Sequence, residues 1–193
     1  MFRFVTYFVI SIFLLASTNA SAKEKTAMES VSDWALDVQE NMKNAWNAEN
    51  YDIYIPVNTW HNRLAYDKEK IDEYNEMPWG AGFGKSFYDY EGNWHGIYAM
   101  AFDDSNYHLQ TIFGYAYQRN WFLDCEREWR VGLGYTLSLT QRHEYSYIPV
   151  PLPLPLAGIG YKNLNLQAAY VPGVKNDGNV LFTWLRWELN NEY

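Results

Sequence analysis

The chain has 193 residues and carries 15 Lys and Arg against 23 Asp and Glu, which gives a formal charge of −8. An acidic chain is repelled by phosphate backbones, and this argues against nucleic acid as a partner. The single cysteine, Cys125, excludes an internal disulfide and leaves a free thiol or a chance intermolecular pair. With 9 Trp and 17 Tyr the chain is rich in side chains that collect at bilayer surfaces.

The first 22 residues predict a secretory signal peptide. Arg3 precedes an apolar run from Phe4 to Ala16, and the small residues Ala20-Ser21-Ala22 suit cleavage after Ala22. The remainder, residues 23–193, is short enough for one domain and contains no repeat or linker. No later segment approaches the roughly 20 apolar residues that a spanning helix needs, so an α-helical membrane protein is not expected.

Residues from about 30 to 47 predict an amphipathic helix. Apolar side chains recur at intervals of three or four from Val31 to Trp46, and Ser30 or Ser32 provides an N-cap. The charged face of this helix is acidic rather than basic. We therefore expect the helix to pack under one rim of the fold instead of adhering to anionic lipid.

Residues 129–140 alternate between two kinds of side chain. Large apolar groups occupy the odd positions from Trp129 to Leu139, and small or polar groups, with Arg130, occupy the even positions. This period of two is typical of a strand with lipid on one side and the inside of a barrel on the other. A soluble barrel would need charged residues on its exterior, and this exterior face would be almost uncharged. The pattern therefore favours a membrane.

Eight strand-like runs, separated by turn residues, follow the helix. They are Asp52–Tyr66, Pro78–Tyr88, Asn93–Phe102, His108–Gln118, Glu128–Gln141, Pro155–Tyr161, Leu164–Val171 and Asn179–Leu189. Eight is an even number and closes an antiparallel barrel. The predicted fold class is therefore an all-β membrane protein, an eight-stranded antiparallel β-barrel preceded by an amphipathic α-helix.

The direction of the strands predicts which loops share one end. If the N-terminal helix stays on the periplasmic side, the odd strands run outward and the even strands return. The loops 67–77, 103–107, 142–154 and 172–178 then face the cell exterior. One feature fits poorly, because the loop 119–127 is long for a periplasmic turn.

The interior is expected to be apolar and to leave some space. Gly114 and Ala116 lie at the inner end of the fourth expected strand, and neither face of the third carries a charged row, so a charged channel is not expected. A barrel of eight strands is too narrow for a pore but can hold one elongated ligand, for which an acyl chain is the best match. A barrel filled by its own side chains, as in a small membrane anchor, accounts for the composition equally well.

Three residues form a candidate catalytic cluster at the outer rim. His61 lies near the outer end of the first expected strand, and Asp104 and Ser105 begin the loop after the third. A histidine, a carboxylate and a hydroxyl can together move a proton and activate an acyl transfer. From the residues alone, an interfacial histidine and a solvated turn are the simpler explanations. The other three histidines lack the spacing of metal ligands, so no metal site is expected.

Seven motifs then occur in a characteristic order. They are Tyr51-Asp-Ile-Tyr-Ile-Pro56, Thr59-Trp60-His61, Ala65-Tyr-Asp-Lys-Glu-Lys70, Pro78-Trp-Gly80, Gly92-Asn-Trp-His-Gly96, Tyr98-Ala-Met-Ala-Phe102 and Asp104-Ser105. In order and spacing they closely resemble PagP, the outer-membrane lipid A palmitoyltransferase family. The resemblance extends from Trp34 to Leu189, which is essentially the whole mature chain.

The resemblance implies a cofactor-independent enzyme in the bacterial outer membrane, with its active site facing the cell exterior. It would transfer a palmitoyl group from the sn-1 position of a glycerophospholipid to a hydroxyl of a lipid A hydroxyacyl chain, and we expect a monomer. His61 would be the general base, and Asp104 would orient or support it. Ser105 would be a nucleophile or a hydrogen-bond donor, and direct transfer is preferred to a covalent acyl-enzyme.

Four prolines are expected to open the barrel wall to lipid. Proline lacks the backbone donor that closes a ladder of strands. Pro56 and Pro78 near one strand pair, and Pro155 and Pro172 near another, match the two lateral openings of the family. Pro78 and Pro155 also suit the start of a strand, and Pro172 suits the end of one.

Two further features concern the substrates. Lys68 and Lys70 are expected to meet the phosphates of lipid A, although a solvated charged loop explains them nearly as well. Ala116 corresponds to the glycine that forms the hydrocarbon ruler of the family. The eight residues from His108 to Ala116 descend roughly 20 Å, about the length of a palmitoyl chain. The added methyl predicts a chain at or just below palmitoyl, and Ala116→Gly should lengthen it.

Other functions stay open at this point. An outer-membrane phospholipase would use the same rim residues with water as the acceptor. A non-enzymatic barrel for adhesion or surface protection is the second alternative, and a soluble lipid-binding barrel is a more distant one. Lys175 and residues 149–156 depart from the pattern of the family, so its gating details do not carry over directly.

Overall fold

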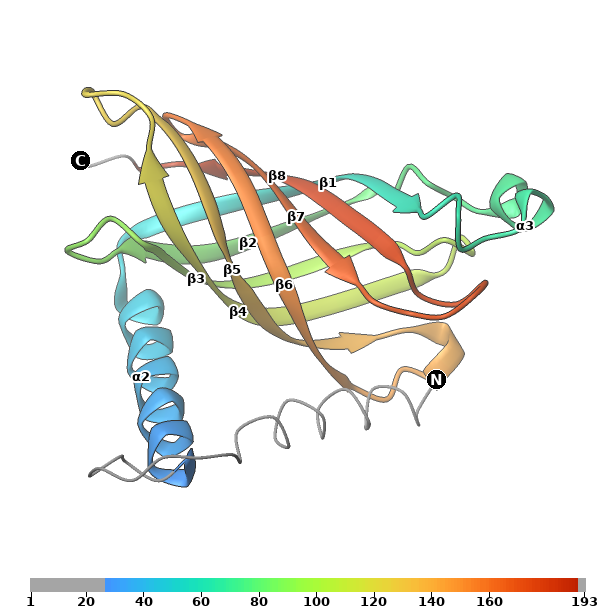
Figure 1. Cartoon of the computed structure of the whole chain (residues 1–193), viewed down its shortest axis with the longest axis horizontal. Coiled ribbons are helices and arrows are strands. Elements are labelled where there is room, and N and C mark those ends of the chain that lie inside the picture. The colour runs from blue at the N-terminus through green and yellow to red at the C-terminus, as the bar shows by residue number, and fades with distance from the viewer. Residues whose placement is uncertain (1–26, 191–193) are drawn as a thin grey trace.

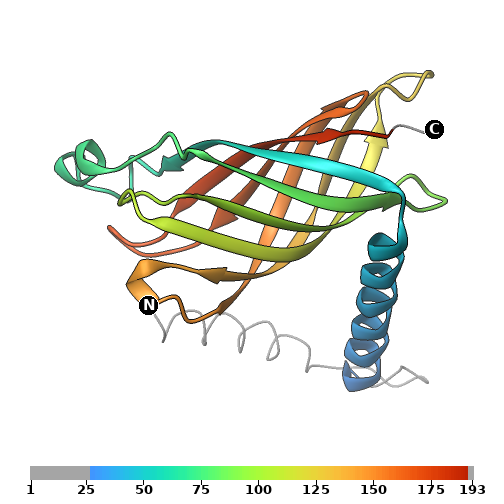
Figure 2. The ribbon, with the colours of Figure 1, turned by 180° about the vertical axis from the view of Figure 1, so that it is seen from behind.

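A closed barrel of eight antiparallel strands dominates the computed structural model, which describes residues 27–190 (Figures 1 and 2). The expected signal peptide, residues 1–22, lies outside the described residues. Helix α2 (Ala27–Asn47) precedes the barrel, and each strand pairs with the next until β8 closes on β1. The strands are β1 (Asn50–His61), β2 (Gly80–Tyr88), β3 (Trp94–Asp103), β4 (Leu109–Phe122), β5 (Trp129–Gln141), β6 (Val150–Tyr161), β7 (Leu164–Val171) and β8 (Val180–Glu188). The predicted fold class is confirmed.

Three strand boundaries differ by more than two residues from those expected. β1 ends at His61 instead of Tyr66, because the carbonyl of Asn62 accepts hydrogen bonds from the amides of Ala65 and Tyr66 and closes a turn. β4 continues to Phe122, which shortens the loop whose expected length fitted a periplasmic turn poorly.

The third difference is that β6 begins at Val150, five residues before Pro155. The prolines at 151, 153 and 155 have a period of two, so the donors they lack all belong to the same edge of the strand. The other edge pairs continuously with β5, from Trp129↔Tyr161 to Thr140↔Val150. A proline-rich segment was therefore mistaken for a loop.

The outer surface of the barrel is apolar. Exposed side chains on it include Phe83, Phe113, Leu133, Leu139, Ile159 and Trp187. In β5, Leu133 and Leu139 face outward, whereas Arg130, Thr136 and Ser138 are buried inside, as the alternation predicts. An apolar exterior around a partly polar interior fits a barrel that spans a membrane. Within residues 27–190, no helix combines the length and the apolar character needed to cross a bilayer.

The interior has two halves. An apolar half contains Met100, Phe102, Ile112, Leu154, Phe182 and Trp184. The half next to α2 contains the buried charged residues Asp52, Arg130, Arg186 and Glu188, which pair with one another. The expectation of an uncharged interior is therefore wrong for this second half. One or two charged residues per strand are too sparse a pattern to reveal such a cluster in the sequence.

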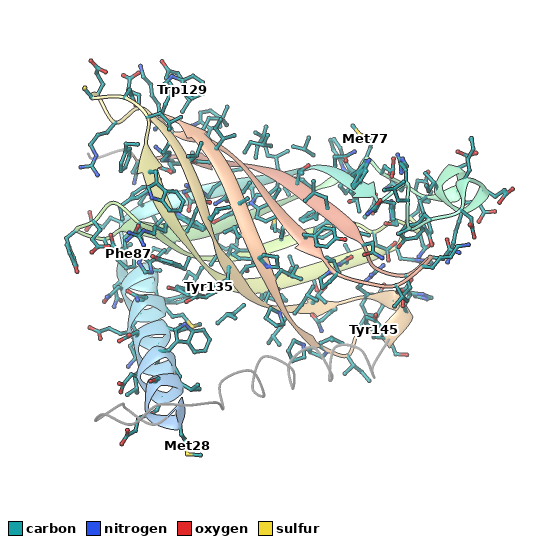
Figure 3. All side chains as sticks on the ribbon, viewed as in Figure 1. Met28, Met77, Phe87, Trp129, Tyr135 and Tyr145 are labelled. Carbon is teal, nitrogen blue, oxygen red and sulfur yellow. The ribbon has the colours of Figure 1, made fainter. Side chains whose placement is uncertain are left out.

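Helix α2 packs at the end of the barrel that contains the charged residues (Figure 1). The Lys85 ammonium donates to the carbonyl of Trp46 at 2.6 Å, which satisfies one of the free carbonyls at the C-terminus of the helix. Farther along, the Trp34 indole donates to the Tyr135 hydroxyl at 3.1 Å, and Figure 3 places Tyr135 on the barrel wall beside α2. The predicted rim-packed helix is confirmed.

The opposite end of the barrel carries four loops, which we call the rim loops. They comprise residues 62–79, 104–108, 142–149 and 172–179, and they include the short helices α3 (Lys68–Glu73) and η1 (His143–Tyr145). Figures 1 and 2 show these loops together at the end away from α2. The candidate catalytic residues therefore lie at one end of the barrel, as the strand directions predict.

Candidate active site

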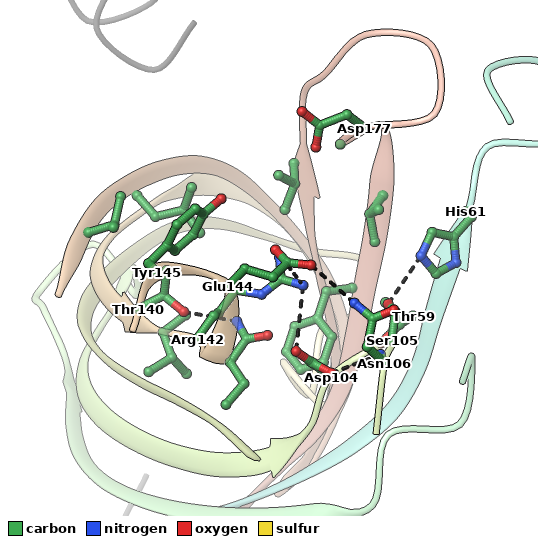
Figure 4. Close-up of a pocket in the computed structure, with 18 of the residues that line it drawn as sticks. Thr59, His61, Asp104, Ser105, Asn106, Thr140, Arg142, Glu144, Tyr145 and Asp177 are labelled. Carbon is green, nitrogen blue, oxygen red and sulfur yellow. Dashed lines mark hydrogen bonds and ion pairs between the residues drawn. The ribbon is translucent and has the colours of Figure 1, made fainter. Parts of the chain in front are cut away.

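A cavity of about 860 Å³ opens among the rim loops and extends into the apolar half of the barrel (Figure 4). This volume lies within the roughly 300–1,000 Å³ of typical small-molecule sites. Polar residues line the mouth, among them His61, Lys70, Ser105, Arg142 and Glu144. Apolar residues line the wall below, namely Phe102, Ile112, Leu152, Leu154, Val171 and Phe182. The cavity therefore suits a molecule with a polar head and an apolar tail.

His61 and Ser105 meet at the mouth of this cavity. The Ser105 Oγ lies 3.1 Å from the His61 Nε2, although the two residues are 44 positions apart (Figure 4). The imidazole is 2% exposed, stacks on the Tyr74 ring at 4.6 Å and meets the edge of the Tyr66 ring at 5.1 Å. Packing from two sides fixes the plane of the ring and aims its Nε2 at the hydroxyl.

The other ring nitrogen of His61 faces a carboxylate that the sequence analysis missed. Glu76 Oε1 lies 3.1 Å from the His61 Nδ1. Arg63 donates to both oxygens of Glu76 at 2.6 Å, and these bonds lower the pKa of Glu76 to about 2. One sequence signal was available, because residue 76 lies two residues before Pro78, where the second strand was expected to begin, and the two ends of a hairpin loop lie close together.

Asp104 has a different position from the one implied by the resemblance. Its Oδ1 accepts hydrogen bonds from the amides of Asn106 and His108 at 2.8 and 3.0 Å, and its Oδ2 lies 3.7 Å from the Arg142 guanidinium. Among residues 27–190, the His61 ring bonds to Glu76 and Ser105 and not to Asp104. Asp104 thus holds the turn that presents Ser105, and its role toward His61 stays a prediction.

Arg142 joins two rim loops across the mouth of the cavity. Its guanidinium lies 3.6 Å from the Glu144 carboxylate, and Glu144 accepts a hydrogen bond from the Asn106 amide at 3.0 Å (Figure 4). Arg142 was not predicted as a site residue, because it directly follows a regular strand and matches the first residue of a solvated loop. The arrangement places a positive charge next to the turn that carries Ser105.

The two lysines predicted to recognise lipid A lie in different surroundings. Lys70 lines the cavity, and its ammonium donates to the carbonyl of Asn176 at 2.9 Å. Lys68 is solvent-exposed, pairs with Asp72 at 2.6 Å and does not line the cavity. The structure therefore brings Lys70 to the site and leaves Lys68 outside it.

The ladder of strands has an opening between β6 and β7. Their pairing ends at Leu156↔Ala169, although β6 begins six residues earlier at Val150. The unpaired stretch contains Pro155, and Pro172 follows directly after β7. The cavity is lined by Leu152 and other residues of this stretch and by the end of β7, so it reaches the opening.

A second interruption lies between β1 and β2. Their pairing ends at Tyr54↔Gly82, whereas β1 continues to His61 in contact with β8. Pro56 follows the last pair on β1, and Pro78 precedes β2. All four predicted prolines therefore border unpaired strand ends, although none of them lines the cavity.

Ala116, the predicted ruler, faces the interior and is 2% exposed, but it does not line the cavity. The nearest cavity-lining residue on the same strand is Ile112. Tyr98 lies between them, because it pairs with Gly114 and its hydroxyl bonds at 2.6 Å to Thr136, the partner of Ala116 on β5. The ring of Tyr98, which does not line the cavity either, thus separates Ala116 from it, and the ruler role stays a prediction.

Metal ligands and thiols add nothing to this site. Across residues 27–190, no three His, Cys, Asp or Glu side chains lie close enough together to hold a metal ion. Cys125 is exposed and carries a free thiol at the opposite end of the barrel from the rim loops.

Comparison with known proteins gives one consistent result. The family described as "Antimicrobial peptide resistance and lipid A acylation protein PagP" matches residues 41–186. Proteins named "Lipid A acyltransferase PagP" are similar to this chain. The Proteus mirabilis protein is 58% identical over 151 residues, which is 78% of this chain and 71% of the relative. The Pectobacterium carotovorum protein is 46% identical over 176 residues, which is 91% of this chain and 83% of the relative.

Proposed function

The chain belongs to the PagP family, and from this premise we propose that it is a lipid A acyltransferase of the outer membrane. The observation that carries the proposal is the pairing of His61 with Ser105 at the polar mouth of an apolar cavity. A hydroxyl bonded to an imidazole is the usual arrangement of a nucleophile and its base. The apolar wall beneath it provides space for an acyl chain.

The proposed donor is a glycerophospholipid whose sn-1 palmitoyl chain, or a slightly shorter one, occupies the cavity. The opening between β6 and β7 supports lateral access from the membrane, because a lipid with its tail in the bilayer reaches the cavity without leaving the apolar phase. The proposed acceptor is a hydroxyacyl chain of lipid A. Lys70 and Arg142 line the mouth and are suited to its phosphates.

The proposed chemistry is a double displacement on the acyl ester. His61 takes the proton of Ser105 while the Ser105 oxygen attacks the ester carbonyl, and the leaving lysophospholipid regains that proton from the imidazole. The lipid A hydroxyl then gives its proton to His61 and attacks the acyl-serine, and the released Ser105 oxygen regains a proton from the imidazole. Direct transfer, preferred from sequence, requires the acceptor hydroxyl to displace Ser105 from the Nε2. The 3.1 Å bond therefore supports Ser105 as the nucleophile.

The proposed orientation places the rim loops outside the cell and α2 in the periplasm. Lipid A occupies the outer leaflet, so a site that acts on it must open at that surface. We propose that the monomer is the active form.

Acyl-chain preference is expected to depend on Tyr98, whose ring lies between the cavity-lining residue Ile112 and Ala116. Ala116→Gly removes a methyl beneath this ring, lets it settle deeper and should shift the preference toward longer chains. Gly114→Ala should shift it toward shorter chains, because the added Cβ would lie 2.8 Å from the Tyr98 ring. Each methylene that no longer fits loses about 0.8 kcal/mol, or roughly fourfold in selectivity. Mass spectrometry of the product from an equal mixture of donors measures the shift, and identical profiles for both variants would contradict this account.

The transferase proposal is tested with purified protein in mixed micelles. The donor carries a labelled sn-1 chain, and lipid A is either present or omitted. We expect most of the label on lipid A when the acceptor is present. Release of labelled fatty acid at the same rate with and without lipid A would instead establish a phospholipase. A folded barrel that moves no label in either mixture would favour the adhesion alternative.

A further inference from the structure

We propose that Glu76, rather than Asp104, is the carboxylate that positions His61, so that Glu76, His61 and Ser105 form one hydrogen-bonded relay. This inference rests on the proposed function and names a positioning residue for it. The resemblance assigns the supporting role to Asp104. Both assignments make separate predictions for the tautomer of His61.

Glu76 and Arg63 together hold His61 in place. Glu76 Oε1 lies 3.1 Å from both the Nδ1 and the backbone nitrogen of His61, so the carboxylate holds the residue at two points. Arg63 fixes the carboxylate in turn through two bonds of 2.6 Å and also donates to the carbonyl of His61 at 3.0 Å. A clamp of this kind leaves the imidazole little freedom to rotate.

The carboxylate of Glu76 also determines which nitrogen of His61 carries the proton. An ionised carboxylate only accepts hydrogen bonds, and Arg63 keeps Glu76 ionised by holding its pKa at about 2. The single proton of a neutral His61 must therefore be on Nδ1, where it is donated to Glu76. The lone pair of Nε2 then faces Ser105, as a general base requires. The carboxylate thus selects the catalytic tautomer.

The backbone of Glu76 is anchored to β1. It precedes β2, and its carbonyl accepts hydrogen bonds from the Thr59 amide and the Asn58 side chain, both at 2.9 Å. The segment therefore attaches to β1 beyond the point at which the β1–β2 ladder stops. The same contacts that bridge the interrupted ladder bring the carboxylate to His61.

The carboxylate of Asp104 is already held by other groups. Two backbone amides hold its Oδ1, and its Oδ2 faces Arg142 on the side away from His61. Removing its charge is therefore expected to loosen the turn of Ser105 without changing the tautomer of His61. Asp104→Asn and Glu76→Gln separate the two assignments.

The proposed test measures the tautomer and the kinetics of the full chain in detergent micelles. Imidazole ¹⁵N NMR reports which nitrogen carries the proton, and the His61 signals are identified by their absence in His61→Gln. We expect the Nδ1–H form in the wild type and in Asp104→Asn. Glu76→Gln should convert His61 to the Nε2–H form or a mixture, because a glutamine side chain can donate to Nδ1.

The kinetic expectation for Glu76→Gln is a fall in kcat of roughly 10²–10⁴-fold, with little change in KM, as for the loss of a catalytic tautomer. Glu76→Asp should recover part of this loss, because it restores the charge. Glu73→Gln, an exposed carboxylate on α3, is the matched control and should behave as the wild type. The charged and titratable groups around His61 are Glu76, Arg63, Tyr66, Tyr74 and Arg142. An acid limb of kcat that differs between Glu76→Gln and the wild type would identify the carboxylate acting through His61.

Three outcomes would overturn the proposal. The first is a Glu76→Gln variant, folded by its gel mobility, that keeps both the Nδ1–H tautomer and nearly wild-type kcat. The second is a change of tautomer in Asp104→Asn but not in Glu76→Gln. The third is a Glu76→Asp variant no better than Glu76→Gln. The tautomer needs no substrate, so a wild-type protein that fails to acylate lipid A would refute the proposed function and still give this readout.

Discussion

Replacing His61 with alanine is expected to lower the rate of acyl transfer by roughly 10²–10⁴-fold, the usual contribution of a general base. The reason is that the His61 Nε2 is the only nitrogen shown within hydrogen-bond distance of the Ser105 hydroxyl in residues 27–190. His143→Ala is the matched control, because this histidine lies in a rim loop but does not line the cavity. Initial rates in mixed micelles give the comparison.

Ser105→Ala and the double variant extend this prediction. If His61 and Ser105 act as one unit, the double variant should be no slower than the slower single variant, because effects within a catalytic unit are not additive. An acyl-serine should also be trapped in the wild type when lipid A is omitted. A Ser105→Ala variant with nearly wild-type rate would instead establish direct transfer, with His61 acting on the acceptor hydroxyl.

Replacing Arg186 with methionine is expected to lower the free energy of unfolding by roughly 3–5 kcal/mol, the usual effect of removing one partner from a buried ion pair. Arg186 is 1% exposed and lies 3.1 Å from Asp52 and 2.8 Å from Glu188. Its guanidinium also lies 4.3 Å from the centre of the Trp94 ring. The variant leaves two buried carboxylates with a single remaining cation, Arg130, which contacts Glu188 at 3.0 Å.

Urea unfolding in lipid vesicles measures this loss, and Arg119→Met provides the control. Arg119 is an exposed residue of β4 at the same end of the barrel as Arg186. Its replacement should change the free energy of unfolding by less than about 0.5 kcal/mol. Adding Asp52→Asn to Arg186→Met should restore part of the stability, because it removes one of the unpaired charges. Equal stabilities for the Arg186 and Arg119 variants would show that the charged cluster does not hold this half of the barrel together.

Alternation of side chains was sufficient to predict the barrel. The period of two in β5 places Leu133 outside and Thr136 inside without any knowledge of the partner strands, since the pleat of a strand alone determines the face. The count of such runs then gave eight strands and a closed sheet. The direction of each strand in turn placed His61 and Ser105 at the same end.

The sequence alone does not show which carboxylate contacts His61. Glu76 reaches His61 only because its segment attaches to β1, and Asp104 turns away only because two backbone amides occupy it. In the sequence, both residues are acidic and lie close to the end of an expected strand, so residue type and position do not distinguish them. Three-dimensional hydrogen bonding, rather than residue type, distinguishes the one at the imidazole.

The interior charges and the position of Tyr98 were also missed for a physical reason. The neutral cluster combines Asp52 of β1, Arg130 of β5, and Arg186 and Glu188 of β8, so no single strand shows it. The side chain of Tyr98, which separates Ala116 from the cavity, reaches across to Thr136. The rotamer of Tyr98 is determined by packing, and no periodic pattern in the sequence predicts it.

The most direct test of the proposed function is the mass spectrum of lipid A from cells that contain no other acyltransferase of this family. Wild-type protein, His61→Ala and His143→Ala are expressed at matched levels in the outer membrane. We predict that lipid A gains the mass of one palmitoyl group, or of a slightly shorter chain, with the wild type and His143→Ala and not with His61→Ala. Unchanged lipid A with the wild type, or an added acyl group that persists with His61→Ala, would contradict the account.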